Sequence, residues 1–145
     1  MTRTHTGGDR DANATGTVVL DTNALMMPVE CDVRVFDELE RVLGAPVDDL
    51  DLVVPAVAVA ELDRLADGAG EAATAARVGR DLADRCRVVE TDASYADDAV
   101  VEVATRGADD RVVVTNDRPL RDRLLDRGVR VAGLRGRNEL AVNTP

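Results

Sequence analysis

Short runs of valine and leucine alternate along the chain with longer amphipathic segments. The runs occupy residues 17–20, 52–54, 87–90, 111–115 and 129–131. Continuous β-branched and aliphatic residues are typical of parallel strands that are buried on both faces. The segments between the runs repeat apolar residues at helical spacing, so strand and helix alternate along the chain. This alternation predicts an α/β fold, with a parallel sheet of about five strands and helices on both faces.

The segments between the strands are bounded by residues that commonly start or stop helices. Helices are predicted from Ala24, over 32–43, from Pro55, and over 71–86, 95–106 and 120–127. Pro28 is expected to interrupt the first helix, and Asp32 is expected to cap the second. Residues 1–16 are polar without periodicity and predict a disordered leader, followed by one domain over 17–134 and a flexible tail over 135–145.

Acidic residues follow the first four predicted strands in turn. They are Asp21, Glu61, Asp97 and Asp117. The carboxyl ends of parallel strands share one edge of a sheet, where ligands bind in open α/β folds, so these acids are expected to meet there. Glu61 lies on the apolar stripe of its helix, and Asp97, unlike its neighbour Asp98, shares a helix face with apolar residues.

Four carboxylates gathered at one edge could not all stay ionised without a cation. Oxygen ligands of this kind suit Mg²⁺ or Mn²⁺, and such an ion activates water for attack on a phosphodiester. Each acid also has a purely structural interpretation. Asp21, Asp97 and Asp117 could cap the helices that follow them, and Glu61 could pair with a buried arginine.

The composition indicates the environment of the protein more than its chemistry. The net charge is −10 and all 18 basic residues are arginine, a bias that resembles proteins of halophiles with acidic, well-solvated surfaces. An acidic chain usually argues against a nucleic-acid partner, but a surface that is acidic for solubility weakens that argument. Arg118, Arg121, Arg135 and Arg137 make the last third locally basic, and they could contact phosphates or simply be solvated.

Membrane and redox patterns do not stand out in the sequence. No apolar run is long enough to cross a bilayer, and the first residues lack the pattern of a signal peptide. The sequence therefore predicts a cytoplasmic protein that does not associate with membranes. Cys31 and Cys86 lack the spacing of a metal or redox site and are predicted to be small apolar residues of the core.

Taken in order, the segments around the four acids resemble the signatures of the PIN-domain nucleases. These segments are residues 19–23, 55–62, 95–99 and 114–120. Within them, the Tyr-Ala-Asp-Asp and Thr-Asn-Asp elements are most similar to the branch of the family that cleaves pre-ribosomal RNA. The resemblance extends from about Thr17 to Leu134, which is nearly all of the chain predicted to be ordered.

The resemblance implies a sheet with strand order 3-2-1-4-5 and a Mg²⁺- or Mn²⁺-dependent endoribonuclease acting in rRNA or tRNA processing. The four acids would be both catalytic and metal-binding, with RNA as the partner and a homodimer as one assembly. Supporting positions would be taken by Asn23, Asp98, Thr115 and Asn116. Two alternatives keep the fold: a toxin-type ribonuclease bound by a small antitoxin-like protein, and a non-catalytic RNA-binding or assembly factor.

Overall fold

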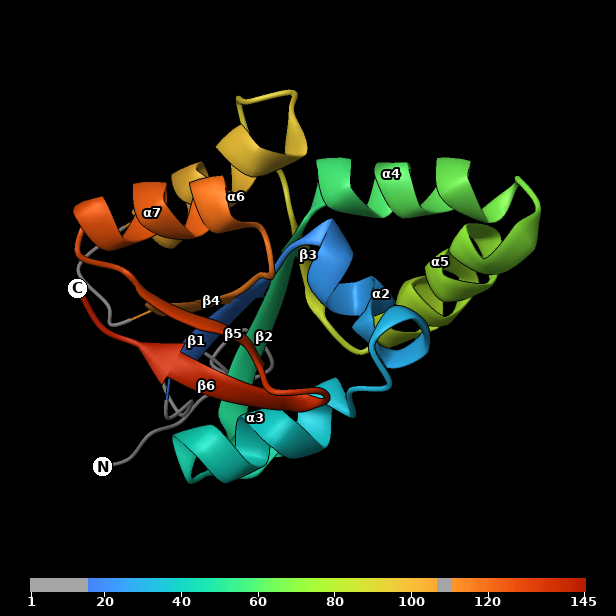
Figure 1. The fold of residues 1–145 in the computed structure, drawn as a ribbon. Helices are drawn as coiled ribbons and strands as arrows, with labels where there is room; N and C mark the ends of the chain where they lie inside the picture. The colour runs from blue at the N-terminus through green and yellow to red at the C-terminus, as the bar shows by residue number, and fades with distance from the viewer. Residues whose placement is uncertain (1–15, 107–110) are drawn as a thin grey trace.

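One mixed sheet forms the centre of the molecule. The computed structural model describes residues 16–106 and 111–145. The strands are β1 (Gly16–Leu20), β2 (Leu50–Pro55), β3 (Arg87–Val89), β4 (Arg111–Val114), β5 (Arg130–Arg135) and β6 (Glu139–Asn143). They lie in the order β3-β2-β1-β4-β5-β6 (Figure 1). Neighbouring strands among the first five run parallel, which confirms the predicted fold and strand order, and β6 is antiparallel to β5. Of the predicted leader, only Gly16 lies within the described residues.

Helices cover both faces of the sheet. They are α2 (Thr22–Glu30), α3 (Val35–Leu43), α4 (Ala56–Ala66), α5 (Gly70–Ala83), α6 (Ala96–Ala104) and α7 (Arg118–Asp126), with a 3₁₀ turn η2 (Val47–Asp49) before β2. Figure 1 shows α6 and α7 together on one side of the sheet, apart from α2, α3 and α5. Among the described residues, no helix has both the length and the apolar character needed to span a bilayer.

Alternating side chains of the central strands divide the core into two layers. In β1, Val18 and Leu20 pack into the cluster beneath α2 to α5, while Val19 packs into the cluster beneath α6 and α7. Strands β2 and β4 alternate in the same way. Because both faces are covered, most residues of these strands are apolar, which is the pattern that the sequence shows.

The first two helices differ from their predicted boundaries. Helix α2 continues through Pro28 to Glu30, because the burial of Leu25, Met26 and Met27 outweighs the hydrogen bond that proline removes. Asp32 does not cap α3; it has a left-handed backbone with φ 54°, and the helix begins three residues later at Val35. The prediction of Asp32 as a cap was therefore wrong.

Helices α2 and α5 approach each other closely at one glycine. A Cβ atom built on Gly79 would lie 2.8 Å from the backbone carbonyl oxygen of Leu25. Gly79 therefore sets the distance between the two helices, and with it the position of α2 above the end of β1. This packing matters to function because the first residues of α2 follow Asp21 directly.

The end of the chain is a strand, where the sequence predicted a flexible tail over residues 135–145. Strand β6 is bound on one side by β5 and on the other by side chains of α3. The backbone N–H of Leu140 donates to Glu38 Oε1 (2.9 Å), and its carbonyl accepts from Arg41 Nη2 (2.8 Å). These bonds give Leu140 at the sheet edge two side-chain partners in place of a further strand.

Candidate active site

The candidate acids come from four elements that begin near the carboxyl edge of the sheet. Asp21 directly follows β1, and Asp117 follows β4 after two residues. Glu61 lies in the middle of α4, which starts at the end of β2 because Pro55 provides an extended residue with φ −66° before the helix. Asp97 is the second residue of α6. The crossover topology thus places the four acids on elements that begin near this edge of the sheet.

Asp21 is the buried member of the set, with 3% of its surface exposed. Its Oδ1 accepts a hydrogen bond from the backbone N–H of Ala24 (2.8 Å). Its Oδ2 accepts from Asn23 Nδ2 (3.1 Å) and from the hydroxyl of Thr115. Both oxygens of this carboxylate are therefore held in place by the chain itself.

The surroundings of Asp21 oppose its ionisation. Burial raises its pKa from 3.8 to about 7, although the hydrogen bonds from Thr115 and Ala24 act in the opposite direction. The negative charges of Asp97 and Asp117 raise this pKa further. The three carboxylates are therefore close enough to interact electrostatically. A nearby cation would offset these effects.

Hydrogen bonds among polar residues join the end of β1 to the end of β4. Asn23 Nδ2 lies 3.4 Å from Thr115 Oγ1, and Asn23 Oδ1 accepts from the backbone N–H of Asn116 (2.9 Å). The Thr115 hydroxyl oxygen in turn accepts from the backbone N–H of Asp117 (3.1 Å). Asn23 and Thr115 thus contact the acids through their side chains, whereas Asn116 contributes its backbone.

Two of the acids also cap helices. Asp21 caps α2 through Ala24, and Asp117 caps α7 because its Oδ1 accepts from the N–H of Leu120 (2.9 Å). The structural interpretation of these two residues therefore holds, but each cap uses only one carboxylate oxygen. Asp97 does not cap α6, since Tyr95 occupies that position.

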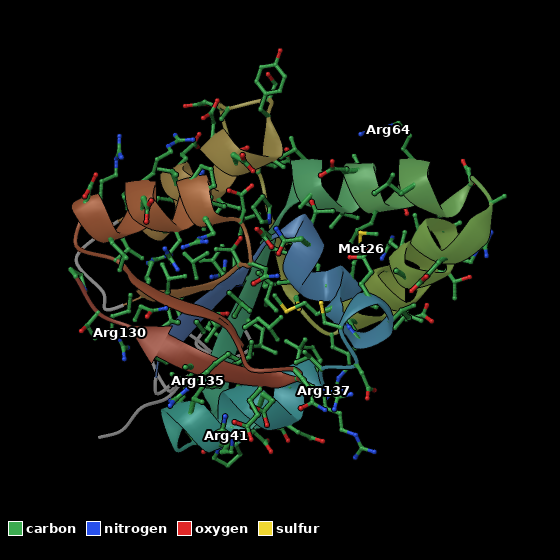
Figure 2. All side chains as sticks on the ribbon, in the orientation of Figure 1. Met26, Arg41, Arg64, Arg130, Arg135 and Arg137 are labelled. Carbon is green, nitrogen blue, oxygen red and sulfur yellow. The ribbon has the colours of Figure 1, made fainter. Side chains whose placement is uncertain are left out.

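Glu61 is held by a residue that the sequence analysis left without a function. Thr22 Oγ1 donates to Glu61 Oε1 over 2.7 Å, which connects α2 to α4. The other oxygen lies 4.0 Å from Arg64 Nη2, and the Arg64 side chain is 71% exposed. Figure 2 shows Arg64 on the outer side of α4, so the predicted alternative, a pair with a buried arginine, is wrong.

Asp97 and Asp98 point to different partners. Burial raises the pKa of Asp97, and the charges of Asp117, Asp98 and Glu61 add to this effect while Arg123 opposes it. Asp98 Oδ1 instead accepts a hydrogen bond from Arg123 Nη2 (3.0 Å), which ties α6 to α7. Asp97 therefore belongs electrostatically with the other candidate acids, and Asp98 forms an ion pair beside them.

The four candidate carboxylates fit some kinds of metal site and not others. Within residues 16–106 and 111–145, no three acidic, histidine or cysteine side chains lie close enough to enclose an ion. Carboxylates that interact over longer distances fit a hard cation that retains several waters and takes one or two protein ligands, as Mg²⁺ does. The hydrogen-bonded oxygens of Asp21 and the raised pKa of Asp97 are compatible with such an ion.

The arginines proposed for phosphate contact lie in two places. Arg118 is the first residue of α7, next to Asp117, and Arg121 follows one turn later beside Asp122. Arg135 and Arg137 lie at the turn between β5 and β6. Figure 2 shows both near β6 and α3, away from α4 and α6. Of these four arginines, Arg118 is the one that directly follows a candidate acid in the chain.

Comparison with known proteins identifies the family. The sequence profile of the PIN like domain matches residues 18–137. The chain belongs to the PIN-like domain family. Comparison with curated protein sequences yields no match. Among solved structures, the PIN domain endonuclease Utp24 superposes with a TM-score of 0.70 at 22% sequence identity, covering 89% of this chain and 92% of the other. At this identity the superposition establishes the fold.

The family match covers all four candidate acids of this PIN-like domain. It runs from Val18 in β1 to Arg137, so it ends before β6. The elements that carry the acids thus lie within the matched part of the chain, and β6 lies outside it. Thr22 could have been found from the sequence only as a hydroxyl beside Asp21, because its partner Glu61 lies 39 residues away.

Proposed function

We propose that this PIN-like domain is a divalent-metal-dependent endoribonuclease. The observation that supports the proposal is Asp21, a carboxylate buried at the end of the central strand whose pKa is raised to about 7 by burial and by neighbouring acids. A group of this kind is typical of functional sites, because burial and like charges destabilise the ionised carboxylate in the absence of a bound cation.

In the proposed mechanism, Asp21, Glu61, Asp97 and Asp117 together would form the site for Mg²⁺ or Mn²⁺, with one or two of them as direct ligands. The ion would supply water activation and would stabilise charge on the phosphodiester. Thr115 and Asn23 orient the Asp21 carboxylate, and Thr22 orients Glu61. Asp21 must lose its proton before it can serve as a ligand, so metal binding and proton release are coupled at this residue.

The proposed substrate is RNA. The solved PIN domain endonuclease Utp24 shares the fold, and the Tyr-Ala-Asp-Asp and Thr-Asn-Asp elements resemble the branch that cleaves pre-ribosomal RNA. Ribosomal RNA is therefore the first substrate to test, and tRNA the second. Arg118 and Arg121 on α7 are the arginines best placed for backbone phosphates near the acids.

One observation favours a second candidate, a non-catalytic RNA-binding or assembly factor. Asp21 and Asp117 both cap helices, which gives each of them a structural reason to be present without any metal. This candidate predicts that neutral caps replace the acids without loss of function. The endonuclease proposal predicts the opposite, so substitution of the acids separates the two.

The test is Mn²⁺ titration calorimetry in molar KCl, followed by incubation of the same samples with labelled ribosomal RNA. Wild type is expected to bind the ion and to cut, and Asp21→Asn and Asp97→Asn are expected to lose both properties. Asp48→Asn removes the same charge from the exposed turn η2 and is expected to behave as wild type. If wild type binds no Mn²⁺ under these conditions, the acids are caps and solvated groups, and the metal-dependent mechanism is wrong.

A further inference from the structure

Tyr95 is an exposed aromatic residue at the start of α6, two residues before the candidate acid Asp97. It is the single tyrosine of a chain without tryptophan. Its surface is 76% exposed, and among the described residues Val88, at 50%, is the other large hydrophobic residue that is exposed. The ring does not serve the start of α6, because Tyr95 makes no side-chain capping bond and its backbone carbonyl accepts from the N–H of Ala99 (2.9 Å). Another residue could fill this backbone position equally well.

The loop that carries Tyr95 is fixed by Glu102 of α6 and by Arg106, which lies just beyond the end of that helix. The Glu102 carboxylate accepts from the backbone N–H of Asp92 (3.0 Å) and of Ala93 (3.0 Å). Arg106 Nη2 donates to the Glu90 carbonyl (2.7 Å) and to Glu102 (2.8 Å). The exposed ring therefore projects from a backbone that is already ordered. A platform of this kind loses little conformational entropy when a ligand binds.

The charges around the ring limit what it can bind. Tyr95 lies two residues before Asp97, and Asp98 and Asp92 are also near it in the chain. Without a bound cation these carboxylates repel phosphate, and Arg123 is already paired with Asp98. What remains for a ligand is the uncharged face of the ring. Nucleobases stack on such faces with little regard to sequence.

We propose that Tyr95 is a stacking site for an unpaired nucleobase next to the phosphodiester that is cleaved. The proposal rests on the endoribonuclease function and adds to it a residue that contacts a base beside the scissile bond. A base within a duplex is covered on both faces by its neighbours, so only a single-stranded loop, bulge or end can offer a free face. The enzyme is thus expected to cut where at least one base beside the scissile bond is unstacked.

The chain offers a direct spectroscopic test, because its tyrosine emission comes from Tyr95 alone. The full-length protein is titrated with an end-labelled single-stranded oligouridylate in Ca²⁺ in place of Mn²⁺, and a gel checks that the RNA stays intact. Tyrosine emission is expected to fall in parallel with the rise in anisotropy of the label. A matched oligomer with abasic sites and a fully paired hairpin are the substrate controls, and both are expected to leave the emission unchanged.

Variants then separate the ring from the fold. Tyr95→Ala is expected to weaken oligonucleotide binding by about 10-fold or more, and Tyr95→Phe, which keeps the aromatic face, is expected to stay within about two-fold of wild type. Val88→Ala removes the other exposed apolar side chain and serves as the matched control, with no expected change. Circular dichroism of each variant confirms that the fold is retained.

Three results would overturn the stacking proposal. Emission from Tyr95 could stay constant while anisotropy reports binding, or Tyr95→Ala could bind as tightly as wild type. Emission could also change with protein concentration in the absence of RNA, which would place a second copy of the chain on the ring. If wild type cuts ribosomal RNA in any of these cases, only the stacking site is wrong. If wild type neither binds nor cuts RNA, the endoribonuclease function is wrong as well.

Discussion

Replacing Asp21 with asparagine should change how the stability of the apo protein depends on pH. Burial raises the pKa of Asp21 from 3.8 to about 7 in the folded chain. Between these two values the folded state therefore binds more protons than the unfolded state. The free energy of unfolding contains a full contribution from Asp21 below pH 3.8, and it loses this contribution as pH rises toward 7. The asparagine of the variant would have no charge to bury, so the variant should show no such loss.

The size of the effect follows from the shift. A rise from 3.8 to about 7 corresponds to about 4 kcal/mol between the protonated and fully ionised limits. Over the narrower range from pH 5 to pH 8, the same shift predicts that wild type loses about 2 to 3 kcal/mol relative to the asparagine variant. The variant also loses an acceptor for Asn23 and Thr115, but this cost is the same at both pH values and cancels from the difference.

The assay is urea unfolding followed by circular dichroism at pH 5 and pH 8, in EDTA and at one fixed KCl concentration. Adding Mn²⁺ at pH 8 should restore stability to wild type but not to Asp21→Asn, because only the carboxylate gains from a bound cation. Asp48→Asn is the control for the loss of one charge, and its free energy of unfolding should change between pH 5 and pH 8 as much as that of wild type. An equal change for Asp21→Asn and wild type would refute the prediction, since it would mean that Asp21 ionises without cost.

Three further predictions concern the supports of the site and the fold. Thr22→Val should lower cleavage about 10-fold or more with little loss of stability, measured by single-turnover kinetics beside urea unfolding, because Glu61 loses its donor. Gly79→Ala should destabilise the protein by about 1–3 kcal/mol in urea unfolding, as its methyl group meets the Leu25 carbonyl; an unchanged midpoint would contradict this contact. Glu38→Ala should lower the free energy of unfolding by about 1 kcal/mol and speed amide exchange in β6, because Leu140 loses its acceptor. If the variant and wild type exchange at the same rate, α3 does not hold the strand.

The parallel strands of the core were predictable because their burial is visible in the sequence as consecutive apolar residues. Strands β1, β2 and β4 are covered on both faces, so valine and leucine fill consecutive positions and mark them. Strand β6 could not be recognised this way. Leu140 is its one buried residue, and the strand depends on partners in β5 and α3 that lie far away in the chain.

The sequence allowed us to predict that the candidate acids lie near one another, but not which hydrogen bonds orient them. Topology alone brings the ends of β1 and β4 together, so the proximity of Asp21 and Asp117 follows from strand order. The bonds that orient the acids do not follow from it. The hydroxyl of Thr22 reaches Glu61 across two helices, and no local pattern distinguishes that hydroxyl from a solvated one.

The caps supply the strongest argument for chemistry at the end of β1. Asparagine and serine cap helices about as well as aspartate does, and neither carries a charge. At Asp21 the cap is buried, and its pKa of about 7 means that the ionised form destabilises the fold at neutral pH. A residue needed only to satisfy the N–H of Ala24 would do so at no such cost if it were neutral. Capping therefore does not explain why residue 21 is an ionisable aspartate. A cation bound at this edge of the sheet would explain it, because the cation would stabilise the ionised carboxylate.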